Sequence, residues 1–118
     1  MKYLCLIYDD EKTFAAMSKA EIDALMQDYR AFGESIKQSG HYIAGHQLAP
    51  VRAASTVRMR NGKMSATDGP FAETKEQLGG YYLVEAADLN EAMQIASRIP
   101  SARIGSIEVR PLHESHQA

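Results

Sequence analysis

The feature of this sequence that most constrains its fold is a long amphipathic segment set between short apolar runs. Ser18 and Glu21 form a capping-box pattern, which marks the start of a helix. The apolar residues that follow recur at intervals of three or four, at Ile22, Leu25, Met26, Tyr29, Phe32 and Ile36. Gly40 then supplies a residue that tolerates the left-handed conformation at a helix end. We therefore predict a helix from 18 to 39 with one apolar face.

Short strand patterns flank this helix. Apolar or alternating runs predict strands at residues 3–8, 42–48, 81–85 and 104–109. Asp88 and Glu91 repeat the capping-box pattern and begin a shorter helix, which ends before Pro100. The two helices and four strands therefore follow the order β-α-β-β-α-β.

A hairpin interrupts that order after the second strand. Asn61-Gly62 separates the strand patterns 56–60 and 63–67, and both residues tolerate the positive φ that a two-residue turn requires. Without this insert the order predicts an α+β fold, ferredoxin-like, with both helices on one face of the sheet.

The first strand is apolar on both sides, which bears on assembly. Tyr3, Cys5 and Ile7 would point to one face of the sheet, and the alternate residues, Leu4, Leu6 and Tyr8, to the other. Two helices can cover only one of these faces. We therefore predict a homodimer that covers the second.

Composition limits the class of protein. The 118 residues predict a single domain over residues 1–112, followed by a polar tail at 113–118. A net charge of −2 gives no basic footprint for nucleic acid or an anionic membrane. The single cysteine and the lack of a long apolar stretch predict a cytoplasmic protein without a membrane partner. No phosphate loop, dinucleotide fingerprint or zinc spacing is present, so we expect neither a cofactor nor a metal.

One loop carries a distinctive motif, Asp68-Gly69-Pro70-Phe71-Ala72-Glu73-Thr74-Lys75-Glu76. Pro70 fixes its own φ and restricts Gly69, so the motif begins in a tight turn. We expect Phe71 to anchor the loop against the core.

The motif, together with the opening 1–8, Leu48-Ala49-Pro50 and the closing 107–112, resembles the YCII-related family and its DGPF-motif branch. The resemblance covers nearly the whole chain. It implies a ferredoxin-like fold assembled as a dimeric α/β barrel. It also implies small enzymes with a proposed catalytic His-Asp pair, one related domain serving in dehydrochlorination of a chlorinated hydroxyhydroquinone. Members of the DGPF branch are often encoded beside alternative sigma factors.

Two residues are candidates for the catalytic pair. The resemblance matches the motif aspartate to Asp68, whereas the helix at 18–39 contains no histidine. His46 on the second strand is the candidate substitute. The alternative role of Asp68 is to cap the turn at Gly69-Pro70.

Five further side chains are candidates for binding a substrate: Tyr8, Arg58, Glu73, Lys75 and Tyr82. Glu76 could line the same polar pocket as Glu73 and Lys75. Arg58 and Lys75 could each hold an anionic group, and the tyrosines could offer hydroxyl groups. The alternative is structural: Arg58 pairs with Asp68 or Glu73, the loop charges are solvated, and either Tyr81 or Tyr82 belongs to the core. Since these two tyrosines are neighbours on a strand, one must face the helices and the other the open side.

Three functions remain open from the sequence. The first is a small cofactor-independent enzyme of lyase or isomerase type, acting on a small polar or aromatic molecule at a dimer cleft. The second is a non-catalytic module that binds a small ligand or regulates a sigma-factor circuit. The third is a purely structural dimer.

Overall fold

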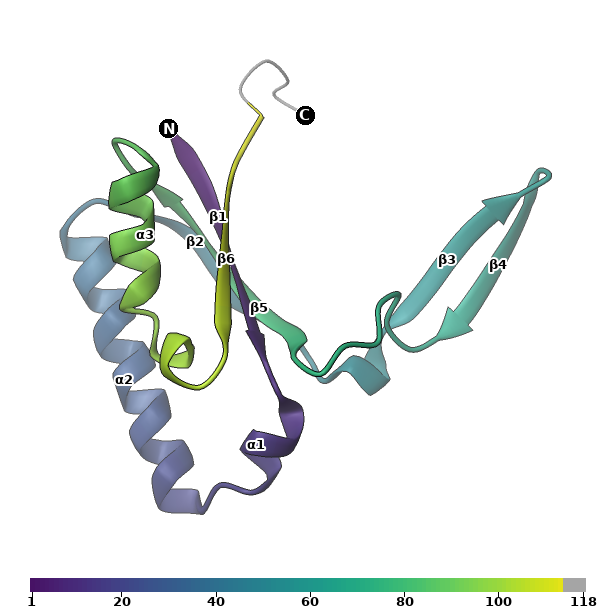
Figure 1. Ribbon diagram of the computed structural model, residues 1–118, viewed down its shortest axis with the longest axis horizontal. Coiled ribbons are helices and arrows are strands. Elements are labelled where there is room, and N and C mark those ends of the chain that lie inside the picture. The colour runs from purple at the N-terminus through teal and green to yellow at the C-terminus, as the bar shows by residue number, and fades with distance from the viewer. Residues whose placement is uncertain (114–118) are drawn as a thin grey trace.

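The computed structural model describes residues 1–113, and its main feature is a four-stranded antiparallel sheet (Figure 1). The strands lie in the order β2 (Tyr42–Gln47), β5 (Gln77–Glu85), β1 (Lys2–Asp9) and β6 (Ser106–Pro111). All three pairings are antiparallel, and β5 and β1 occupy the centre. This mixed α+β arrangement is compatible with a ferredoxin-like fold.

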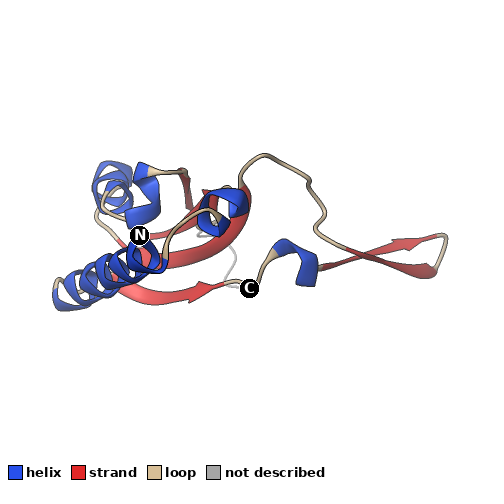
Figure 2. Ribbon diagram, turned by 90° about the horizontal axis from the view of Figure 1, so that it is seen from below, coloured by secondary structure: helices blue, strands red, loops and turns tan. Residues whose placement is uncertain are grey.

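Helices α2 (Lys19–Gln38) and α3 (Leu89–Ser97) lie on the same face of the sheet (Figures 1 and 2). Ser18 and Glu21 cap α2 reciprocally, with N–H···O distances of 3.1 and 2.9 Å. Gly40 follows the helix with φ of +80°. Both helices predicted from the sequence are confirmed.

Three short helical elements connect the larger ones: α1 (Glu11–Ala15), η1 (Val51–Ala53) and η2 (Pro100–Arg103). They were not predicted from the sequence, because none of the three is long enough to show an apolar period. η2 also moves the last strand. It begins at Ser106 rather than at the predicted Ile104, since the N–H of Gly105 still donates to the carbonyl of Ser101 at 2.8 Å.

The core lies between the sheet and the helices. Residues Tyr3, Cys5 and Ile7 of β1 are buried there, as their alternation predicts. The side chains of Phe32 and Ile36 from α2 pack against the same core. Burial raises the pKa of the Cys5 thiol to about 11, so this cysteine is an inert core residue.

The opposite face of the sheet carries no helix, and we call it the open face. The alternate residues of β1 and their neighbours on β5 form its apolar centre, since Leu4 pairs with Leu83 and Leu6 pairs with Tyr81. All four side chains are partly buried.

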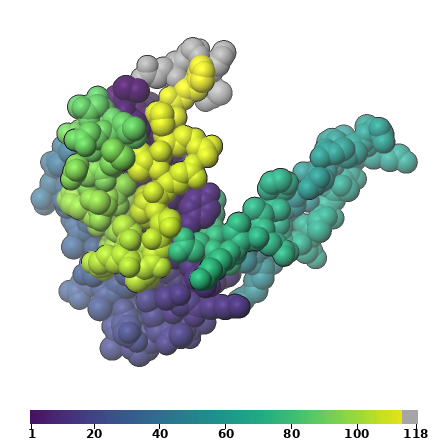
Figure 3. Space-filling model, viewed as in Figure 1, coloured from purple at the N-terminus to yellow at the C-terminus, as the bar shows by residue number. Residues whose placement is uncertain are grey.

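The predicted hairpin forms a second sheet, in which β3 (Ser55–Arg60) pairs with β4 (Lys63–Asp68). We call residues 55–68 the arm. Asn61 and Gly62 have φ of 53° and 74°, as the two-residue turn requires. The arm projects from the body (Figure 3), and the radius of gyration is 16.2 Å, against about 13 to 14 Å for a compact domain of this length.

Phe71 does not anchor the loop against the core. Its side chain is 79% exposed, and the guanidinium of Arg58 lies 5.6 Å from the centre of its ring. The expectation failed because the turn at Gly69 follows the arm, which leaves no core beneath the loop.

Gly105 offers a test of how closely β1 and the end of η2 approach. A Cβ at this position would lie 2.2 Å from the carbonyl oxygen of Tyr8. We expect Gly105→Ala to lower the free energy of unfolding by about 2 kcal/mol or more, because backbone must move. Gly33 in α2 is the control: nothing lies within 4 Å of its Cβ position, and Gly33→Ala should raise the free energy by about 1 kcal/mol. Urea denaturation measures both, and equal effects would contradict this account.

Candidate functional site

A groove of about 580 Å³ opens where β1 and β6 meet the loop before β5. It is lined by Tyr8 of β1, by Thr74, Lys75 and Glu76 of the loop, and by Ser106, Ile107 and Glu108 of β6. Because β6 is an edge strand, the groove lies at the rim of the sheet.

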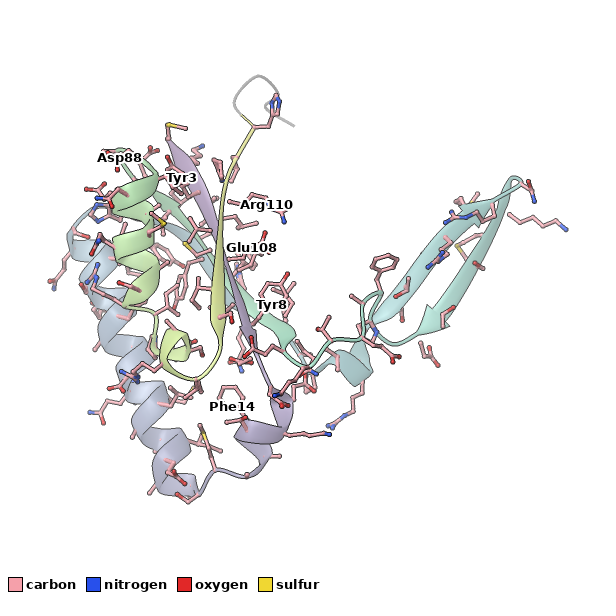
Figure 4. All side chains as sticks on the ribbon, viewed as in Figure 1. Tyr3, Tyr8, Phe14, Asp88, Glu108 and Arg110 are labelled. Atoms are coloured by element: carbon pink, nitrogen blue, oxygen red, sulfur yellow. The ribbon has the colours of Figure 1, made fainter. Side chains whose placement is uncertain are left out.

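Strand register places the polar side chains of the groove on the open face. Tyr8 pairs with Ser106 and Leu6 pairs with Glu108, so all four residues share that face. Figure 4 shows Tyr8, Glu108 and Arg110 on the side away from the helices. The guanidinium of Arg110 hydrogen-bonds the carboxylate of Glu108 and forms an ion pair with it.

Hydrogen bonds fix the loop that forms the other wall. The carboxylate of Glu76 accepts from the Ser106 hydroxyl at 2.8 Å, which ties the loop to β6. The Thr74 hydroxyl donates to the Glu76 carbonyl at 2.5 Å, and the Gln77 amide donates to the Thr74 carbonyl at 2.8 Å. Lys75 lies between these fixed residues with an exposed side chain.

A buried polar cluster lies at the end of β1, close to the groove. The hydroxyls of Tyr29 and Ser101 are 2.5 Å apart, and Ser101 also hydrogen-bonds Asp9, which is 7% exposed. Burial raises the pKa of the Asp9 carboxyl. Ser101 opposes this rise, and the charges of Glu76 and Glu11 add to it. Burial likewise raises the pKa of Tyr29.

No cluster of three or more potential metal ligands occurs within residues 1–113. In the same part of the chain, none of the helices is both long and apolar enough to cross a lipid bilayer.

Comparison with known proteins identifies the family. The model of the YCII-related domain matches residues 1–115. This chain belongs to the YCII-related family. An uncharacterised protein of Rhizobium meliloti (strain 1021) is similar to it, with 42% identity over 114 residues that cover 95% of this chain and 92% of that protein.

The groove of this YCII-related chain brings together two of the predicted binding residues, Tyr8 and Lys75. Glu73 is exposed on the same loop but does not line the groove. Tyr82 faces the helices, with its ring centre 5.1 Å from that of Phe32, and burial raises its pKa to about 12. It therefore belongs to the core rather than to the open face.

The predicted catalytic pair is not assembled in this YCII-related chain. His46 lies on β2, at the other edge of the sheet from the groove, and its Nδ1 is 2.9 Å from the Tyr81 hydroxyl. Asp68 ends the arm. Among residues 1–113, no hydrogen bond or ion pair joins it to His46.

Within residues 1–113, Arg58 forms no ion pair with Asp68 or Glu73, the two partners that the structural alternative gave it. In the arm, Asp68 pairs with Ser55 and Arg58 pairs with Ser65, which places the two charged side chains on opposite faces. Gly69 is positioned by backbone instead, since its N–H donates to the Ala54 carbonyl at 2.7 Å.

Two residues of the groove, Ser106 and Glu108, were not among the candidates predicted from the sequence, whereas Glu76 was. A signal for Ser106 and Glu108 was present. They alternate with Ile107 and Val109 along the predicted strand 104–109, which predicts one polar and one apolar face.

The raised pKa of Asp9 makes stability depend on pH. Between its ordinary value of 3.8 and the raised value, the folded state binds more protons than the unfolded state. The free energy of unfolding therefore decreases as pH rises through that range, because the preference of the folded state for the protonated carboxyl is lost. We expect Asp9→Asn to gain in stability relative to the wild type as pH rises from 3.8 towards neutrality, in urea denaturation at several pH values.

Ser101→Ala is the matched control, because it keeps the carboxyl and removes the hydrogen bond that lowers its pKa. The free energy of unfolding of this variant should depend on pH more steeply than that of the wild type. A constant difference between Asp9→Asn and the wild type at every pH would contradict the assignment.

Proposed function

We propose that this YCII-related protein binds a small molecule with an anionic group in the groove beside β6. The observation that supports this is the lining of the groove, which includes Lys75, Tyr8 and Ser106. Its volume of about 580 Å³ suits a small organic ligand.

One cation of the groove is available to an anionic group of a ligand. The Glu76 carboxylate accepts from Ser106, and the Glu108 carboxylate pairs with Arg110. No salt bridge within the described residues involves the ammonium of Lys75. Lys75 is therefore the cation of the groove that a carboxylate or phenolate of the ligand would contact.

The ligand-binding unit in this proposal is a homodimer. The open face presents an apolar centre that no helix covers, and a second copy of the sheet would cover it. The resemblance to the DGPF-motif branch supports the same assembly, a dimeric α/β barrel. In such a dimer the groove at the rim becomes part of a cleft between protomers.

The binding proposal is tested by titrating the protein with succinate and 4-hydroxybenzoate and following the thermal midpoint, which rises when a ligand binds only the folded state. We expect Lys75→Ala to raise the dissociation constant about tenfold, which is a loss of about 1.4 kcal/mol of binding free energy. Lys19→Ala at the start of α2 removes the same charge outside the groove and should bind like the wild type.

Asp68→Ala separates this site from the motif turn. Because Asp68 does not line the groove, the variant should retain the ligand-dependent rise. Loss of binding in Asp68→Ala with retention in Lys75→Ala would move the site to the turn and overturn the proposal.

A second candidate is a cofactor-independent enzyme of lyase or isomerase type. The observation that favours it is that a carboxylate, Glu76, and a phenol, Tyr8, line the same groove. In this chemistry the carboxylate would take a proton from a carbon beside a carbonyl group, and the phenol would donate a hydrogen bond to the resulting enolate oxygen.

Deuterium exchange tests the enzyme candidate. We expect a small keto acid such as oxaloacetate to exchange its α-protons in D₂O faster with the wild type than with Glu76→Gln, by at least about 100-fold. Proton NMR measures both rates. Equal rates would exclude Glu76 as the base and leave the binding function.

A further inference from the structure

The arm has two chemically different faces. Cross-strand partners share a face, and the pairs Val57–Ala66 and Met59–Met64 lie on one of them. Arg58, Ser65, Arg60 and Lys63 lie on the other. We call these the apolar face and the basic face of the arm.

The apolar face is open to solvent in the single chain. Val57, Met59 and Met64 are 58%, 58% and 68% exposed. A two-stranded hairpin without further packing is marginally stable at best in water. An exposed apolar face of this kind marks an interaction surface.

The position of the arm indicates what covers it. The helices lie on one side of the sheet, and the arm extends from the other side, where the open face lies (Figures 1 and 2). The arm and the open face therefore border one concave surface. A second copy that covers the open face would lie alongside the arm.

Charge favours the body of a second copy as the partner. The arm, residues 55–68, contains three basic side chains, Arg58, Arg60 and Lys63, and one acidic one, Asp68. The rest of the chain has the other 10 basic and 14 acidic side chains, so formal charges of +2 and −4 make up the total of −2. The arm of one copy and the body of another attract each other.

Area supports the same partner. Four strands about 4.8 Å apart and about 20 Å long give the open face only about 400 Å², half of the roughly 800 Å² that each partner of a stable interface buries. One face of the arm adds about 200 Å², and the surface that receives the partner's arm adds about 200 Å² more. With the arms included, the interface reaches the standard size.

From these observations we propose that the arm is a clasp. The apolar face of each arm packs on the body of a second copy, so the homodimer is held both by its open faces and by two exchanged arms. This inference rests on the homodimer of the proposed function and adds the arm as a required part of the interface.

The test compares lysines introduced on the two faces of the arm. Met59→Lys/Met64→Lys places charges on the apolar face, and Ser65→Lys adds the same type of charge on the basic face. Sedimentation velocity over a range of concentrations gives the dissociation constant. We expect the double variant to raise it by at least about 100-fold and Ser65→Lys to leave it within about threefold.

Val57→Lys is a second variant on the apolar face, and it should also weaken the dimer. Far-UV circular dichroism confirms that each variant is folded, which is expected because the arm does not contact the core. A wild-type dimer that both apolar-face variants leave intact overturns the clasp but keeps the homodimer. A wild-type monomer overturns both, whereas ligand binding in the groove is measured separately with Lys75→Ala.

Discussion

The structure depends on the two apolar faces of β1 and on the fact that the helices cover only one of them. Tyr3, Cys5 and Ile7 alternate with Leu4, Leu6 and Tyr8, so a central strand of the sheet is apolar on both sides. Two helices bury the first set and form the core. The second set remains on a surface that a single chain leaves uncovered. Burial of the face under the helices therefore stabilises the body. The open face is the surface on which a partner can bind.

The candidate site lies where this uncovered face ends. At the edge strand β6 the open face changes from apolar to polar, since Glu108 and Arg110 lie beside Leu6 and Leu4 of β1. The loop before β5 is tied to this edge by the bond between Glu76 and Ser106, which leaves the Lys75 side chain free to point outward. A groove with a fixed wall and an exposed cation suits a ligand that approaches from solvent. Its place at the rim would let a dimer enclose it without burying it in an apolar core.

Local signals in the sequence predicted most of the fold. The capping box of α2, the N-cap of α3 at Asp88 and the turn at Asn61-Gly62 each fix backbone geometry within a few residues, and each was confirmed. The placement of the hairpin was not predictable in this way, because no local pattern states whether an insert packs on the body or projects from it. For the same reason the sequence did not predict that Phe71 is exposed, since its burial depends on where the hairpin lies. The opposite faces of Arg58 and Asp68, however, follow from hairpin register, so the sequence contained that information.

In most small domains the same residues determine both the stability of the fold and its assembly with other molecules. The projecting arm separates these two properties. The side chains of the arm lie outside the core cluster, so substitutions there leave the packing of the body unchanged. The core can accept few changes, because its side chains fill a shared volume. In the proposed clasp, sequence change in the arm is limited mainly by what the arm touches in the second copy. Related chains could thus acquire different assembly partners through a short hairpin while they keep the same folded body.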